Sequence, residues 1–229
     1  MVVAPVPAAS TAGADGSSTD MTLTASDALA RLREGNRRFV SGVRSLDALL
    51  TQTRRADLAT SHRPFAIVLG CSDSRVPAEL VFDQGLGDLF VIRVAGNIVA
   101  PSQVGSVEFA VERFGIRLVV VLGHTCCGAV TATLEQLRAG AHPSPNLRSI
   151  VDRIRPTVET VLATGAALDD EEIVRQAVRA NVRSAADHLR HGSALLESLH
   201  RDGLRVVGAE YSLSTGEVDF FDGETLDGT

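Results

Sequence analysis

Apolar residues follow two different spacings along the chain. Short runs rich in Val, Ile and Leu, bounded by Gly or Pro, predict buried strands. These runs cover residues 65–70, 89–94, 116–122 and 204–211, with an edge strand expected at 217–221. Segments with apolar residues at every third or fourth position predict helices. They cover residues 26–41, 102–114, 128–138, 147–163 and 169–199, the last of these interrupted near His191 and Gly192.

The order of these segments indicates an α/β fold. A strand, a helix and a second strand follow one another between residues 89 and 122, which predicts a right-handed parallel crossover. We therefore expect a central, mainly parallel sheet of four or five strands flanked by helices. Ser26 is the expected N-cap of the first helix, whose apolar face packs either on its own chain or on a neighbouring subunit. Residues 43–63 have little pattern, and 76–86 predict a loop or a short helix.

The N-terminal segment differs in composition from the rest of the chain. Residues 1–22 are rich in Ala, Pro, Gly, Ser and Thr and lack the positive stretch of a secretory signal, which predicts a flexible tail. Residues 23–229 are long enough to bury a sizeable core, and we expect them to form one domain.

Charge and cysteine content restrict the partners and the compartment. The chain has 22 basic and 28 acidic residues, a formal charge of −6, which argues against a nucleic-acid or anionic-membrane surface. No apolar run reaches the length of a membrane-spanning helix. The three cysteines, two of them adjacent, argue against a disulfide framework and favour a reducing compartment, so we expect a cytoplasmic protein.

Metal-ligating side chains follow two of the predicted strands. Cys71 and Asp73 come directly after the first strand, and His124 and Cys127 come after the third. Ligands collect at the carboxyl ends of parallel strands, so neighbouring strands would bring Cys71, His124 and Cys127 together. Two thiolates and an imidazole suit Zn²⁺, and a catalytic zinc keeps its fourth position for water. Asp73, two residues from Cys71, can compete for that position.

The two ligand-bearing motifs together resemble the zinc site of the β-class carbonic anhydrases. The similarity extends over residues 25–221 and includes the segments 75–77, 82–83, 87–93, 95–97 and 105–110. The motif residues are Cys71, Asp73 and Arg75 in the first stretch, and His124, Cys127 and Gly128 in the second. The spacing of three residues from His124 matches the family pattern at Cys127 rather than at Cys126.

The resemblance implies a function and assigns roles to residues. The expected enzyme binds Zn²⁺, interconverts CO2 and bicarbonate, and forms a homodimer or homotetramer. Cys71, His124 and Cys127 would hold the zinc, with Asp73 as an alternative fourth ligand. Arg75 would draw Asp73 away from the metal so that water takes that position. The implied substrate-binding residues are His62, Phe90, Ala95, Phe109 and Gly128.

Several alternatives remain open at this point. His62 stands where many family members carry a glutamine, and it either donates to substrate or points away. The rings of Phe90 and Phe109 line the family's CO2 pocket, sometimes from the neighbouring subunit, or serve as ordinary core residues. A hydrolase for CS2 or COS would use a similar site. A zinc-stabilised binding module without turnover would keep Asp73 permanently on the metal, and the presence of Arg75 argues against it.

Overall fold

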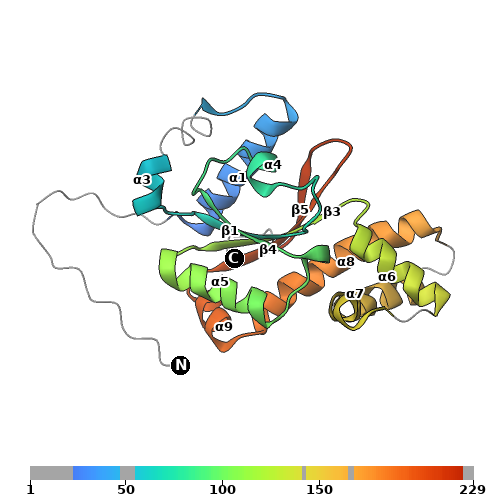
Figure 1. Cartoon of the computed structure of the whole chain (residues 1–229). Helices are drawn as coiled ribbons and strands as arrows, with labels where there is room; N and C mark the ends of the chain where they lie inside the picture. The colour runs from blue at the N-terminus through green and yellow to red at the C-terminus, as the bar shows by residue number, and fades with distance from the viewer. Residues whose placement is uncertain (1–22, 47–54, 141–142, 165–167, 224–229) are drawn as a thin grey trace, which may run out of the picture.

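The computed structural model describes residues 23–46, 55–140, 143–164 and 168–223. Its centre is a five-stranded sheet in the order β2-β1-β3-β4-β5, in which the first four strands are parallel and β5 is antiparallel to β4 (Figure 1). The strands are β1 (Ala66–Gly70), β2 (Leu89–Arg93), β3 (Leu118–His124), β4 (Arg205–Tyr211) and β5 (Val218–Asp222). The predicted α/β fold with a mainly parallel sheet is confirmed.

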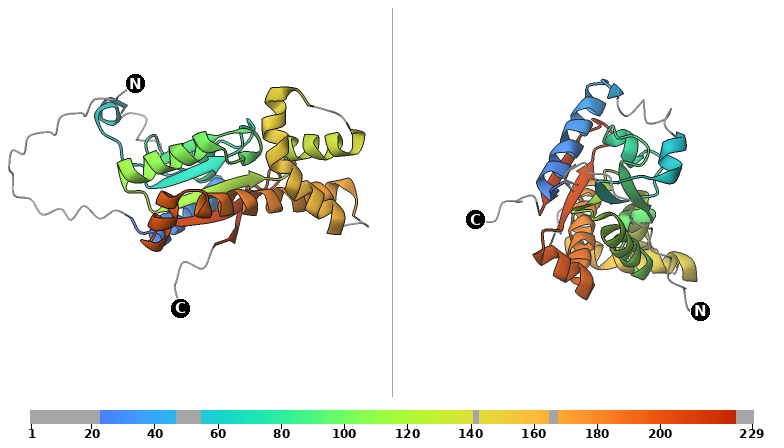
Figure 2. Two further views of the ribbon diagram at one scale, coloured as in Figure 1. Left: turned by 90° about the horizontal axis from the view of Figure 1, so that it is seen from below. Right: turned by 90° about the vertical axis from the view of Figure 1, so that its left-hand side faces the viewer.

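Helices cover both faces of the sheet and extend beyond one end of it. They are α1 (Ala25–Val40), α3 (Arg55–Thr60), α4 (Ala78–Val81), α5 (Pro101–Phe114), α6 (Gly128–Ala139), α7 (Pro145–Thr164), α8 (Asp170–His191) and α9 (Ala194–Arg201), with a 3₁₀ turn η1 at Ala95–Asn97. Figure 1 shows α1 and α4 on one face and α5, α8 and α9 on the other. Figure 2 shows α6 and α7 beyond the end of the sheet.

The strands β1 and β3 form the centre of the core. Every residue of both strands is buried, as expected for parallel strands with helices on both faces. Successive side chains alternate between the two faces. Val120 and Leu122 therefore pack with α1 and α4, whereas Val119 and Val121 pack with α5 and α8. A third apolar cluster lies between α6, α7 and α8, and it includes Cys71 and Cys127.

The boundaries of several elements differ from the sequence prediction. The first helix begins at Ala25, and its cap is Thr24, whose hydroxyl accepts from the Asp27 N–H at 3.1 Å, so the prediction of Ser26 as the cap was wrong. The helix expected from 102 begins one residue earlier, at Pro101, where proline suits the first turn. The strand expected at 116–122 is β3, which continues to His124 because β4 provides paired partners as far as Tyr211.

Three further expectations can be compared with the structure. Helix α3 lies within residues 43–63, where no element was predicted, and residues 47–54 are outside the described part. The predicted interruption near His191 is confirmed, since α8 ends there and Ser193 caps α9 by accepting from the Leu196 N–H. The predicted tail at 1–22 lies outside the described residues. None of the helices in the described part is both long enough and apolar enough to cross a bilayer.

Candidate metal centre

Two neighbouring strand ends bring the three candidate metal ligands together. Cys71 directly follows β1, His124 is the last residue of β3, and Cys127 is the N-cap of α6. Because β1 and β3 are paired and parallel, with Gly70 opposite Leu122, both strands end at the same edge of the sheet. The Cys71 and Cys127 sulfurs and a ring nitrogen of His124 all lie within 4.8 Å of one another.

The orientation of the His124 ring is fixed from one side. Its Nδ1 lies 2.9 Å from the carbonyl oxygen of Thr125, which can only accept, so Nδ1 carries the proton. The other nitrogen, Nε2, is buried and has no hydrogen-bond partner in the described part of the chain. Buried polar atoms rarely remain unpaired, and a histidine that donates through one nitrogen typically binds metal through the other.

The Thr125 carbonyl is itself held in place by the neighbouring strand and turn. The Thr125 N–H donates to the Tyr211 carbonyl at 3.0 Å. Its hydroxyl accepts from the Leu213 N–H at 3.0 Å. No residue pattern marks Thr125 as functional, because its contribution is made by a backbone carbonyl.

The two buried thiols shift each other's pKa in opposite directions. The pKa of Cys71 is lowered to about 4, chiefly because the Cys127 thiol donates to its sulfur. Burial opposes this shift. His124 and the Gly96 N–H, which lies 3.3 Å from the sulfur, lower the pKa further. The pKa of Cys127 is raised far above its usual range because its thiol donates to Cys71 and is buried. Burial lowers the pKa of His124, but the adjacent Cys71 sulfur with its negative charge outweighs that effect and raises the pKa overall.

These donors suit a zinc ion. Two sulfurs and one imidazole nitrogen lie within 4.8 Å of one another, a donor set typical of zinc. Binding of a dication would displace the thiol proton, since thiolates rather than thiols are the ligands. Cys126 lies outside this group, with an exposed side chain and a left-handed backbone at φ 55°.

Asp73 and Arg75 form a bidentate pair beside the three ligands. Arg75 donates from Nε to Oδ1 at 2.9 Å and from Nη2 to Oδ2 at 2.8 Å, and its backbone N–H also donates to Oδ1 at 3.0 Å. The Arg75 guanidinium holds the pKa of Asp73 well below its usual range, against a smaller effect of burial. The Oδ2 atom lies 3.9 Å from Nε2 of His124, so the carboxylate borders the group of three candidate ligands.

Arg93 fastens the loop that carries Cys71 and Asp73. From the end of β2, its Nε donates to the Cys71 carbonyl at 3.1 Å and its Nη2 donates to the Asp73 carbonyl at 2.5 Å. The loop is thereby tied to the neighbouring strand on the side away from β3. This positioning role was not predicted from the sequence, because it depends on the pairing of Arg93 with Gly70 across two strands.

Ala95 and Gly128 lie next to the candidate metal centre. Ala95 precedes Gly96, whose N–H donates to the Cys71 sulfur. Gly128 follows Cys127 and is the first residue of α6. A Cβ atom built on Gly128 would have no neighbour within 4 Å, so open space lies beside the first backbone N–H groups of that helix.

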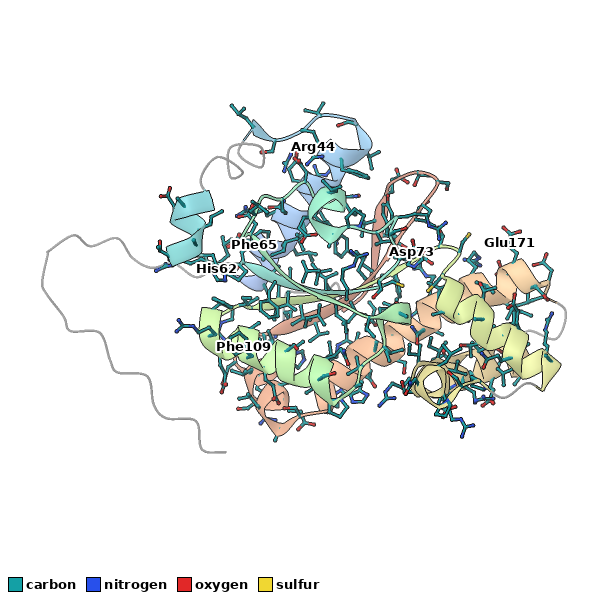
Figure 3. All side chains as sticks on the ribbon, viewed as in Figure 1. Arg44, His62, Phe65, Asp73, Phe109 and Glu171 are labelled. Atoms are coloured by element: carbon teal, nitrogen blue, oxygen red, sulfur yellow. The ribbon has the colours of Figure 1, made fainter. Side chains whose placement is uncertain are left out.

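His62, Phe90 and Phe109 lie at the other end of the sheet. His62 precedes β1, which has five residues and is therefore about 16 Å long, whereas Cys71 follows it. The His62 ring lies 5.1 Å from the Phe114 ring, and the Phe90 and Phe109 rings are 6.3 Å apart. They line a pocket of about 850 Å³. Figure 3 shows His62 and Phe109 at the opposite end from Asp73.

The fold and the site together define a class of protein. The chain has an α/β fold with a Cys2His donor set, compatible with a metal ion, at the carboxyl edge of its parallel sheet and a carboxylate–guanidinium pair beside it.

Comparisons with known proteins identify the family. A family model described as carbonic anhydrase matches residues 66–218. Curated relatives include a carbonic anhydrase of Mycolicibacterium smegmatis, 42% identical over 82% of this chain and 89% of that protein. Another is carbonic anhydrase 2 of Mycobacterium tuberculosis (strain H37Rv), 40% identical over 81% of this chain and 87% of that protein.

Solved structures agree with the sequence relatives. The β-carbonic anhydrase CafA of Aspergillus fumigatus superposes with a TM-score of 0.68 at 28% identity, covering 86% of this chain and 90% of that one. A structure from a study of two tetrameric β-carbonic anhydrases of Sordaria macrospora gives a TM-score of 0.67 at 26% identity, covering 76% of this chain and 88% of that one. The chain belongs to the β-carbonic anhydrase family.

Proposed function

We propose that this chain is a zinc-dependent carbonic anhydrase that catalyses the reversible hydration of CO2 to bicarbonate and a proton. The observation that carries the proposal is the arrangement of three buried donors around an unpaired His124 Nε2, with the Asp73 carboxylate alongside but tied to Arg75. A structural zinc site would use four protein ligands. Here the fourth candidate is held away by its own partner.

The metal would be held by the Cys71 and Cys127 sulfurs and by Nε2 of His124. When bound, zinc supplies a Lewis acid that makes water acidic enough to act as a nucleophile near neutral pH. The protein keeps the donor set ready for it: the Gly96 N–H stabilises the Cys71 thiolate, and the Thr125 carbonyl holds His124 in the required tautomer.

Asp73 is the residue that orients the reacting water. With Nη2 of Arg75 on Oδ2 and two further donors on Oδ1, the carboxylate stays ionised and has a fixed direction. As an acceptor 3.9 Å from His124 Nε2, Oδ2 is suited to accept a hydrogen bond from that water and so to orient its lone pair toward CO2. Arg75 is half-exposed and performs the holding role.

The substrate pocket is assembled from two chains. Ala95 and the Gly128 N–H border the metal centre of the same chain, whereas His62, Phe90 and Phe109 are too distant in that chain to reach it. Strand β2 is an edge of the sheet, and Phe109 is 55% exposed. A homodimer, or a homotetramer built from such dimers, would bring the aromatic end of one subunit to the metal centre of the other.

The assembly is testable by changing one exposed ring. Phe109→Glu should convert the oligomer to monomers and abolish CO2 hydration while one zinc per chain is retained. Leu147→Glu, at an apolar residue on α7 that is also exposed, is the matched control and should change neither property. Sedimentation velocity and metal analysis give both readouts, and a fully active monomer would contradict the two-chain pocket.

Two further features complete the proposal. Residues 23–229 act as one domain in the cytoplasm, where a reducing environment keeps the zinc thiolates from oxidising. The tail at 1–22 takes no part in catalysis, so its deletion should leave turnover unchanged.

A hydrolase for CS2 or COS is the rival function. Rates measured with CO2, COS and CS2 on one zinc-loaded sample separate the two, and a preference for either sulfur compound would overturn the proposal.

A further inference from the structure

A second, smaller pocket lies between α7, α8 and the backbone that follows η1. It has a volume of about 100 Å³ and opens to solvent. Its polar lining consists of Arg153, Asn181, Ser184 and His188. No carboxylate from the described residues lines it, and the nearby Asp152 and Asp187 are paired with Arg155 at 3.7 Å and with His191 at 3.6 Å. The pocket is distinct from the metal centre and from the aromatic pocket.

Arg153 is fixed in position but retains free donors. Its Nε donates to the Val99 carbonyl at 3.0 Å, and its Nη1 donates to the Ser149 carbonyl at 2.6 Å. Its Nη2 forms no hydrogen bond within the described part of the chain, and no carboxylate there pairs with it. A guanidinium held by two carbonyls loses little conformational entropy when it binds an anion, and its planar fork matches an oxyanion.

Three other polar groups approach the pocket from one face of α8. Asn181, Ser184 and His188 are separated by three and four residues, which places them in a row along the helix. Asn181 forms the floor, is 3% exposed, and donates from Nδ2 to the Gly96 carbonyl at 2.8 Å. The side chains of Ser184 and His188 have no hydrogen-bond partner among the described residues.

The chemistry of this lining selects for a small anion. A free guanidinium edge, a hydroxyl and an imidazole supply donors, and no lining group bears a negative charge. The volume of about 100 Å³ is well below the roughly 300–1,000 Å³ of pockets that hold drug-sized ligands, which suits a small oxyanion rather than a nucleotide or a peptide. Charge-assisted bonds from a fixed arginine are the strongest contacts available to such an ion.

We propose that this pocket binds a small oxyanion, held by Arg153 Nη2, Ser184 and His188. Two sources share that chemistry: inorganic phosphate, and bicarbonate, the product of the proposed reaction. The proposal does not depend on turnover, because binding is measured separately from the metal centre. Its failure and a failure of CO2 hydration are therefore distinguishable.

Isothermal titration of the zinc-loaded protein with phosphate, and separately with bicarbonate at pH 8, tests the site. Arg153→Met removes the donors and keeps the aliphatic stem. It should weaken the binding of at least one of the two anions about tenfold, the loss expected for one charge-assisted hydrogen bond. Ser184→Ala should weaken the same anion about threefold, as expected for a neutral hydrogen bond. The anion that responds identifies the source.

The control is Arg148→Met, which makes the same charge change at an exposed position of α7 outside the pocket. It should leave both dissociation constants unchanged. Anion bound only at the metal would respond to none of the three substitutions, and equal constants in all four proteins would overturn the proposal. If circular dichroism shows that Arg153→Met does not fold, Ser184→Ala still decides: an unchanged constant for both anions refutes the site.

Discussion

The Thr125 hydroxyl accepts from the Leu213 N–H, and the Thr125 carbonyl accepts from His124 Nδ1. This connection predicts that the Thr125 hydroxyl, although it is not a metal ligand, controls zinc affinity. Thr125→Val keeps the shape of the side chain but removes the acceptor of the Leu213 N–H, which lies 3.0 Å from the hydroxyl. An orphaned, part-buried donor costs about 1–3 kcal/mol, and the turn is expected to move to relieve that cost. The Thr125 carbonyl, 2.9 Å from His124 Nδ1, would move with it.

The expected size of the effect follows from the position of the contact. Loss of a group that supports a metal ligand typically costs 10–100-fold in metal affinity. Here the Thr125 N–H still donates to the Tyr211 carbonyl at 3.0 Å, so part of the restraint on His124 remains. We therefore expect the lower limit, a rise of about tenfold in the zinc dissociation constant, or about 1.4 kcal/mol.

Competition with a chromophoric chelator measures this constant directly. Thr125→Ser keeps the acceptor and should bind zinc within about twofold of the unmodified protein, while Thr125→Val should show the full loss. Comparing the two separates the hydroxyl from the rest of the side chain. An unchanged zinc affinity for Thr125→Val would show that the turn does not position His124.

Three further changes test other parts of the account. Cys71→Ser or Cys127→Ser should remove zinc, whereas Cys126→Ser should retain one zinc per chain, as measured by atomic absorption. Loss of zinc from the Cys126→Ser variant would reverse the ligand assignment. Arg75→Ala should retain zinc but lose CO2 hydration because the freed Asp73 carboxylate then competes for the metal; unchanged turnover would remove the pair from the mechanism. The Asp83 carboxylate accepts hydrogen bonds of 2.7–2.9 Å from Arg38 Nε, Arg44 Nε and the Ser45 N–H. Burial alone would raise the pKa of Asp83, but these hydrogen bonds lower the pKa overall. Asp83→Asn should therefore cost about 2 kcal/mol of unfolding free energy at pH 7. In urea unfolding, the difference in unfolding free energy between the unmodified protein and Asp83→Asn should be intact above pH 4 and should shrink as the pH falls below 4. The reason is that the stabilisation by a carboxylate with a lowered pKa is lost on protonation. A difference that does not shrink at all as the pH falls would contradict the ionic origin.

The sequence predicted the sheet and the clustering of the three candidate metal ligands for physical reasons that the structure makes plain. Apolar runs such as 65–70 are unambiguous because both faces of a parallel strand are buried. Soft ligands directly after two such runs must meet if the strands are neighbours, and β1 and β3 are neighbours. The relative positions of His62 and Cys71 could also be predicted, since one precedes β1 and the other follows it.

The remaining features depend on information that residue patterns do not contain. Thr24 and Ser26 are both good N-caps, and only the hydrogen bond to the Asp27 N–H decides between them. The bonds from Gly96 N–H to Cys71 and from His124 to the Thr125 carbonyl involve backbone groups, which every residue possesses. Arg93 shows the same limit from the donor side, because its targets are two carbonyls of the ligand loop.

The central claim is that one zinc ion, held by Cys71, His124 and Cys127, is required for CO2 hydration. The direct measurement is a titration of the metal-free protein with zinc, in which stopped-flow CO2 hydration and bound metal are recorded on the same samples. Activity should rise in proportion to bound zinc and reach its plateau at one ion per chain. Activity in the metal-free protein, or a fully zinc-loaded protein without CO2 hydration, would contradict it.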